Sequence, residues 1–190
     1  MKRMHVTLMT LAALMLAGEA WAAAAATSAN AGTNGRGNGT AQATATYTGD
    51  QGFARTDTQT GQVNLARGVA VGVDEHGLSI SVSNAIASQR GPAIATNFNL
   101  TIGADGSRSV SVGAAIAPGL GARSAGAGGS TAVTRTGTTA TSTATGTAQY
   151  GKVRVETRAE DRPAPRPMIV VPRPEVRRPV APVAVWYFRH

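Results

Sequence analysis

Large apolar side chains alternate with small ones along most of residues 62–117, and this alternation constrains the fold more than any other feature. In the stretch "GLSISVSNAIA", residues 77–87, Leu78, Ile80, Val82 and Ile86 share one side, while the other side holds only serine and alanine. A period of two, interrupted by glycine, proline and aspartate, is typical of half-buried β-strands. The segment is therefore predicted to form strands joined by short turns.

The turns between these strands specify how the strands pair. They are centred on Glu75/His76, Arg90 and Asp105. A slip of one residue at any turn would place apolar side chains on both faces of the sheet. The register that avoids this sets Phe98 between Val82 and Val112. We predict a mainly-β fold, a small antiparallel β-meander of about four strands over 62–117 that can extend to 157, with low-complexity, largely disordered flanks.

The two faces of this sheet differ in side-chain size. The face opposite the apolar one carries nothing larger than asparagine. Such a face can lie in water, or a second sheet can approach it very closely. The apolar face needs a cover, because a patch of that size is not left open to water on an isolated sheet. Later strands of the same chain and a second copy of the chain are the two candidates for that cover.

One row of the predicted sheet interrupts the apolar face. Arg67, Asn84, Thr96 and Ala114 fall side by side in the same register. In one interpretation this is a polar row near the end of the sheet, with Arg67 reaching water. In the other, Arg67, Asn84 and Thr96 form a polar notch that binds a ligand. We favour the first interpretation.

The first 22 residues have the pattern of a secretory signal peptide. Lys2 and Arg3 precede an apolar run over 6–18, and Ala20 and Ala22 flank Trp21 as small residues of a cleavage site. The apolar run is shorter than the roughly 20 residues of a membrane-spanning helix. We expect cleavage after Ala22 and a secreted or periplasmic protein, the alternative being an uncleaved membrane anchor. The chain has no cysteine, which excludes disulfides and a lipid-bearing cysteine.

The flanks of the meander are low in complexity. Residues 23–61 are rich in alanine, threonine, glycine and asparagine and are predicted to be flexible, although patches such as "TATYT" could form edge strands. Residues 118–147 are predicted to be a linker or threonine-rich strands, and 148–161 a short strand. Residues 162–190 form a basic tail that holds most of the chain's prolines and is predicted to be extended polyproline II.

Residues suited to catalysis are scarce. The three histidines, His5, His76 and His190, have no partners that suggest a nucleophilic triad or a metal site. The stretch "GTAQYGK", residues 146–152, is similar to the start of a phosphate-binding loop, but Val153 stands where serine or threonine would hold magnesium. We therefore expect no enzyme activity, no cofactor, no metal and no small-molecule substrate.

Three non-enzymatic functions fit the sequence. The first is a structural or interaction protein of the bacterial envelope that self-associates through its sheet. The second is binding of anionic envelope polymers or membrane surfaces through the tail arginines Arg166, Arg173, Arg177 and Arg178. The third and most remote is ice binding through the Thr-x-Thr arrays Thr44/Thr46/Thr48 and Thr56/Thr58/Thr60, whose spacing along the chain is irregular.

Overall fold

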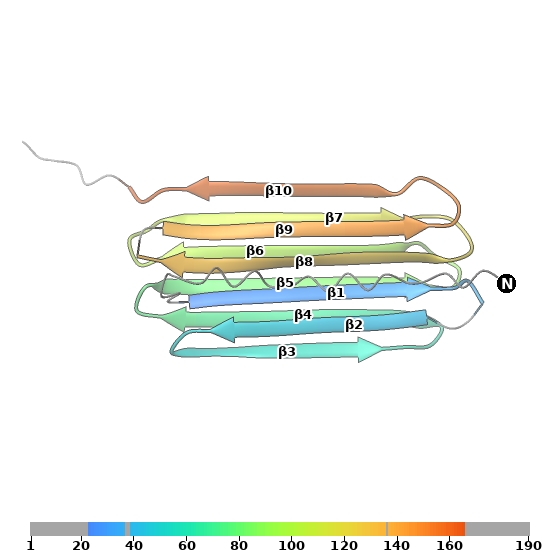
Figure 1. Cartoon of the computed structure of the whole chain (residues 1–190), viewed down its shortest axis with the longest axis horizontal. Helices are drawn as coiled ribbons and strands as arrows, with labels where there is room; N and C mark the ends of the chain where they lie inside the picture. The colour runs from blue at the N-terminus through green and yellow to red at the C-terminus, as the bar shows by residue number, and fades with distance from the viewer. Residues whose placement is uncertain (1–22, 37–38, 136, 166–190) are drawn as a thin grey trace, which may run out of the picture.

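Two antiparallel β-sheets face each other in the computed structural model, which describes residues 23–36, 39–135 and 137–165 (Figure 1). The four-stranded sheet has the order β2-β1-β8-β9 and contains β1 (Ala23–Thr33), β2 (Gly39–Thr48), β8 (Arg123–Thr134) and β9 (Gly137–Ala148). The six-stranded sheet has the order β10-β7-β6-β5-β4-β3. It contains β3 (Gln51–Gln59), β4 (Val63–Asp74), β5 (Gly77–Ser88), β6 (Ala93–Gly103), β7 (Arg108–Ala117) and β10 (Arg154–Arg162). The mainly-β prediction is confirmed.

The predicted meander forms the centre of the six-stranded sheet. Strands β4 to β7 pair in chain order, with Val82 opposite Phe98 and Phe98 opposite Val112. Every apolar row therefore stays on one face. The register predicted by keeping all large apolar side chains on the same face is correct.

The flanks contribute six further strands, so the expected count of about four is too low. Strands β1 to β3 lie in the segment 23–61, which we expected to be flexible. Strands β8 and β9 lie within 118–148, where a linker and threonine-rich strands were the two alternatives. The patch "TATYT" belongs to β2, which is an edge strand as predicted. These segments hold few large apolar side chains, among them Tyr47, Phe53 and Val133, but alanines and other small residues at alternate positions of β1, β2 and β9 fit a closely packed interface.

The molecule's core consists of small side chains between the two sheets. Its buried cluster is made of alanines from β1, β4, β5, β6, β7 and β8. Strand β1 lies over β4 and β5, β8 over β5 and β6, and β9 over β6 and β7, while β3 and β10 lie at the outer margins (Figure 1). The small-residue face of the meander is thus the inner face, and the large apolar side chains point outward. Later strands of the same chain, one of the two candidates for the cover, do not cover the apolar face within the described residues, because β8 and β9 cover the opposite face.

Buried hydroxyl and amide groups join the two sheets. The Thr27 hydroxyl on β1 lies 2.8 Å from the Ser81 hydroxyl and 2.6 Å from the Ser83 hydroxyl on β5. The Ser79 hydroxyl donates to the carbonyl of Ala23 at 3.0 Å, and the Asn99 amide donates to the carbonyl of Thr141 at 3.0 Å. Because buried polar groups are costly unless they are hydrogen-bonded, these contacts fix the relative position of the sheets.

Candidate functional surfaces

The outer side of β4 to β7 is a largely apolar surface, which we call the apolar outer face. It combines Leu65, Val69, Val71 and Val73 of β4; Leu78, Ile80, Val82 and Ile86 of β5; Ile94, Phe98, Leu100 and Ile102 of β6; and Val110, Val112 and Ile116 of β7. At its centre, Phe98 is 41% exposed and Val112 is 40% exposed. Exposed apolar surfaces of this extent mark interaction sites in soluble proteins.

The predicted polar row crosses the apolar outer face. Arg67 lies opposite Asn84, Asn84 opposite Thr96, and Thr96 opposite Ala114. The row continues onto both outer strands, with Asp57 beside Arg67 and Glu156 beside Ala114. The three residues of the proposed notch are thus neighbours in the middle of the face, rather than at the end of the sheet. Ligand binding by the row stays a prediction.

Charged side chains border the apolar outer face along β10. Arg154, Glu156, Arg158, Glu160 and Arg162 occupy alternate positions of this strand and share the outer face. The Arg162 guanidinium lies 2.7 Å from the Glu160 carboxylate, and Arg158 lies 3.9 Å from it. The hydrogen bond and positive charge of Arg162 hold the pKa of Glu160 below its usual value. The apolar surface therefore ends at a row of alternating charges.

The outer side of the four-stranded sheet carries threonines along both edges, and we call it the threonine face. The edge strands contribute Thr40, Thr44, Thr46 and Thr48 from β2 and Thr139, Thr141, Thr143, Thr145 and Thr147 from β9, all exposed. In four of the five rows across the sheet, a threonine of β2 and one of β9 occupy the two ends. Only glycine, alanine, serine and asparagine lie between the two edge strands, and the described part of the face has no charged side chain.

The sequence analysis recognised only part of the threonine face. Thr44, Thr46 and Thr48 were singled out and lie on it together. Thr56 and Thr58 belong to β3 in the other sheet, and Thr60 follows the end of that strand. The threonines of β9 were missed, although their strict alternation over 139–147 was a readable signal.

The turn that contains His76 has no metal-site geometry. The His76 Nδ1 atom lies 3.9 Å from the Asp74 carboxylate and 3.7 Å from the Glu75 carboxylate. Asp74 instead accepts hydrogen bonds from the backbone N–H groups of His76 and Gly77, which is a common turn arrangement. Among the residues that the structure describes, no group of three histidine, cysteine or acidic side chains could hold a metal ion.

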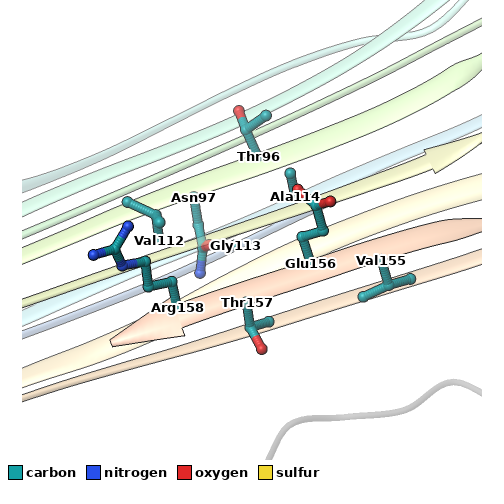
Figure 2. Close-up of a pocket in the computed structure, with 9 residues that line it drawn as sticks. All are labelled: Thr96, Asn97, Val112, Gly113, Ala114, Val155, Glu156, Thr157 and Arg158. Atoms are coloured by element: carbon teal, nitrogen blue, oxygen red, sulfur yellow. The ribbon is translucent and has the colours of Figure 1, made fainter. Parts of the chain in front are cut away.

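A hollow of about 780 Å³ lies beside β10 and is lined by residues of β6, β7 and β10 (Figure 2). Thr96 and Val112 lie on the outer face of the six-stranded sheet, and Asn97 and Thr157 lie on its inner face. The Asn97 amide donates to the carbonyl of Gly128, while its Oδ1 atom has no partner. A Cβ at Gly113 would stand 2.5 Å from that oxygen, so the amide group lies against the β7 backbone. The Asn97 amide is therefore held between the sheets, and the remaining polar lining of the hollow comes from Thr96, Glu156, Thr157 and Arg158.

Several predicted features lie outside the described residues. They are the signal peptide over 1–22 and the tail arginines Arg166, Arg173, Arg177 and Arg178. Binding of anionic polymers through these arginines stays a prediction. Within the described segments, no helix is long and apolar enough to cross a membrane.

Comparison with known proteins gives no relative. No known protein family, no curated protein and no solved structure matches the chain. The function must therefore be argued from the surfaces themselves.

Proposed function

We propose that the protein is an exported, non-enzymatic structural protein of the bacterial envelope, and that two copies associate through the apolar outer face. The observation that carries this proposal is the reversed arrangement of the six-stranded sheet. Its small side chains are buried and its large apolar side chains, Phe98 among them, remain accessible.

The size of the apolar outer face suits a stable interface. With about 4.8 Å between strands and about 6.8 Å between residues on one face, each side chain covers roughly 33 Å². Five rows across four strands, the polar row with Arg67, Asn84 and Thr96 included, give roughly 650 Å² on one copy, or about 1,300 Å² for two faces in contact. Specific protein interfaces bury about 1,200–2,000 Å² in total.

A second copy is the occupant that these residues fit best. Large valine, isoleucine, leucine and phenylalanine side chains fill the usual separation of about 10 Å between two packed sheets. The charged strand β10 would lie at the margin of such an interface, where charges stay in water, whereas Arg67 would lie inside it beside Asp57 of β3. The same apolar composition on both partners makes the contact self-complementary, as a twofold-symmetric dimer requires.

The mass of the mature protein in solution tests this proposal. Light scattering across a dilution series should give a dimer that dissociates as the protein is diluted. Phe98→Lys should yield a monomer at concentrations where the parent is dimeric, because it places a charge at the centre of the face. Thr143→Lys adds the same charge to the threonine face and should leave this dimer intact.

Two outcomes would contradict self-association through this face. One is an unchanged mass for Phe98→Lys. The other is a monomeric parent whose apolar outer face is nevertheless protected from solvent, which would assign the cover to residues 166–190 of the same chain.

The threonine face favours ice binding as a second candidate function. Threonine repeats every two residues along β9 and, except at Gln42, along β2, a spacing of about 6.8 Å that presents hydroxyl and methyl groups at regular intervals. The face also lacks the charges and aromatic rings that would recognise anions or sugars. An ice recrystallisation assay tests this function. Activity should be lost in Thr143→Lys and retained in Thr56→Lys on β3, whereas an inactive parent protein would exclude ice binding.

A further inference from the structure

Among the residues that the structure describes, strand β10 is an unpaired edge that is exposed along its whole length. It ends the strand order of the six-stranded sheet, and all nine of its residues are exposed. Figure 1 shows it at the margin of the molecule, beyond β9. The side of β10 away from β7 therefore has free backbone N–H and C=O groups that can pair with another strand.

The alternating charges of β10 determine which strand can pair with it. Charges on an edge strand often prevent pairing with another strand. They do so here when the antiparallel pair is centred on Arg158, the middle residue of β10. That register places Arg158 opposite Arg158 of a second copy and Glu156 opposite its Glu160. Like charges would then meet in every outer row, which is destabilising.

An offset of two residues reverses this result. When the antiparallel pair is centred on Ala159, Glu156 faces Arg162 of the second copy and Arg158 faces its Glu160. Each of these pairs occurs twice because the arrangement is symmetric. On the opposite side of the strand, the Thr157 hydroxyl can donate to the second copy's Asp161. We propose that β10 pairs with β10 of a second copy in this register, joining two six-stranded sheets into one of twelve strands.

The competing offset is less favourable. Centring the pair on Thr157 also matches arginine with glutamate, but it sets Lys152 opposite Arg162 of the second copy. The register centred on Ala159 avoids this repulsion. Pro163, just after β10, has no backbone N–H and limits the hydrogen-bonded ladder at that end.

This edge contact differs from the face contact of the proposed function. Its twofold axis is perpendicular to the sheet, so the contact closes on itself and gives a dimer rather than an open fibre. Both apolar outer faces then lie on the same side of the joined sheet. The edge contact would thereby double the apolar surface that is available to other copies.

Charge exchange tests the edge contact in the Phe98→Lys background, which removes the face contact if that contact exists. This parent should form a dimer at high concentration. Adding either Arg158→Glu or Glu160→Arg creates two like-charge pairs and should weaken the dimer by about tenfold or more. Mixing these two variants should restore association as a heterodimer detected by native mass spectrometry, because both central pairs then join arginine to glutamate. The double variant carrying both changes should again form a homodimer.

Arg55→Glu on β3, the other edge of the sheet, is the matched control and should leave the dimer unchanged. All substituted positions are exposed, so folding should persist, and far-UV circular dichroism checks it. The edge contact is overturned if the Phe98→Lys parent is monomeric throughout, or if the single variants dimerise as well as the parent and their mixture gives no preference for the heterodimer. A failure of the face contact would appear separately, as an unchanged mass on introducing Phe98→Lys into the wild-type protein.

Discussion

Glycine at two inner positions of β4 lets the sheets approach each other closely. A Cβ at Gly68 would stand 2.6 Å from the carbonyl oxygen of Thr44, and one at Gly72 would stand 2.4 Å from that of Thr48. Both oxygens belong to the backbone of the facing sheet, so neither can move without shifting a strand. The lack of side chains at these positions therefore helps set the separation of the sheets.

We expect Gly72→Ala to lower the free energy of unfolding by roughly 1–3 kcal/mol, the usual cost of overpacking a core. Urea denaturation measures this change. Gly61→Ala is the control, because a Cβ there meets nothing within 4 Å. Equal stabilities for the two variants would show that the sheets are further apart than described.

Asp105 stabilises the turn between β6 and β7. The Ser107 hydroxyl donates to its carboxylate at 2.6 Å and the Ser107 N–H donates to it at 2.8 Å, and these bonds lower the Asp105 pKa from 3.8. Gly106 completes the turn with φ of 84°. A pKa that is lower in the folded state gives stability above the unfolded value, and this stability is lost as the pH falls through the folded value.

Asp105→Ala should therefore destabilise the protein at neutral pH by an amount that shrinks as the pH falls below 3.8. Thermal unfolding of both proteins between pH 7 and pH 2 would measure it. A difference in melting temperature that does not depend on pH would rule out the carboxylate as its cause.

At the scale of the strand, Phe98 in the middle of β6 shows how exposed the apolar outer face is. The notable feature is that its side chain is 41% exposed, while Ala95 on the same strand is 1% exposed. A fully buried phenylalanine costs about 3–5 kcal/mol when truncated to alanine. We expect Phe98→Ala to cost about 1–2 kcal/mol in dilute, monomeric protein, because roughly half of that contact is missing.

Ala95→Val provides the matched comparison, because it adds volume to the inner face. It should cost about as much as Phe98→Ala or more, since the close approach of the sheets leaves no room for a larger side chain. Chemical denaturation at low protein concentration compares the two. A cost of 3 kcal/mol or more for Phe98→Ala would mean that this face is covered within one chain.

The strands that could be predicted from the sequence are those with large apolar side chains. In β4 to β7, the alternation of large apolar side chains predicted both the strand pairing and the shared face of residues such as Phe98 and Val82. In β1, the inner residues Ala23, Ala25 and Ala29 bury too little apolar surface to produce such a signal. Their burial depends on a facing sheet that has equally small side chains, which is a property of the whole fold.

The candidate surfaces were predictable to a similar extent. The neighbours Arg67, Asn84 and Thr96 followed from the register of the meander. Asp57 and Glu156 could not be added to that row, because their positions depend on the pairing of β3 and β10. Which face of the meander is buried could not be deduced either, since the rule that large apolar side chains lie inside is reversed here.

At the scale of the whole molecule, the protein is a sandwich whose small residues are inside and whose large apolar residues are outside. Hydrogen bonds between the sheets, such as that from Ser79 to Ala23, compensate for the polar composition of the interior. The two outer surfaces differ in character, since one is apolar and the other is lined with threonine. This asymmetry is the basis of the two proposed functions, self-association through the apolar outer face and ice binding through the threonine face.

Cysteine labelling of two adjacent residues tests this arrangement most directly, because the chain contains no cysteine of its own. Ser111 is 1% exposed and Val112 is 40% exposed, and they point to opposite faces of β7. In dilute mature protein, the thiol of Val112→Cys should react rapidly and become protected as the concentration rises and copies associate. The thiol of Ser111→Cys should stay protected at every concentration. Rapid labelling of Ser111→Cys together with protection of Val112→Cys in dilute monomer would contradict the reversed arrangement of the sheet.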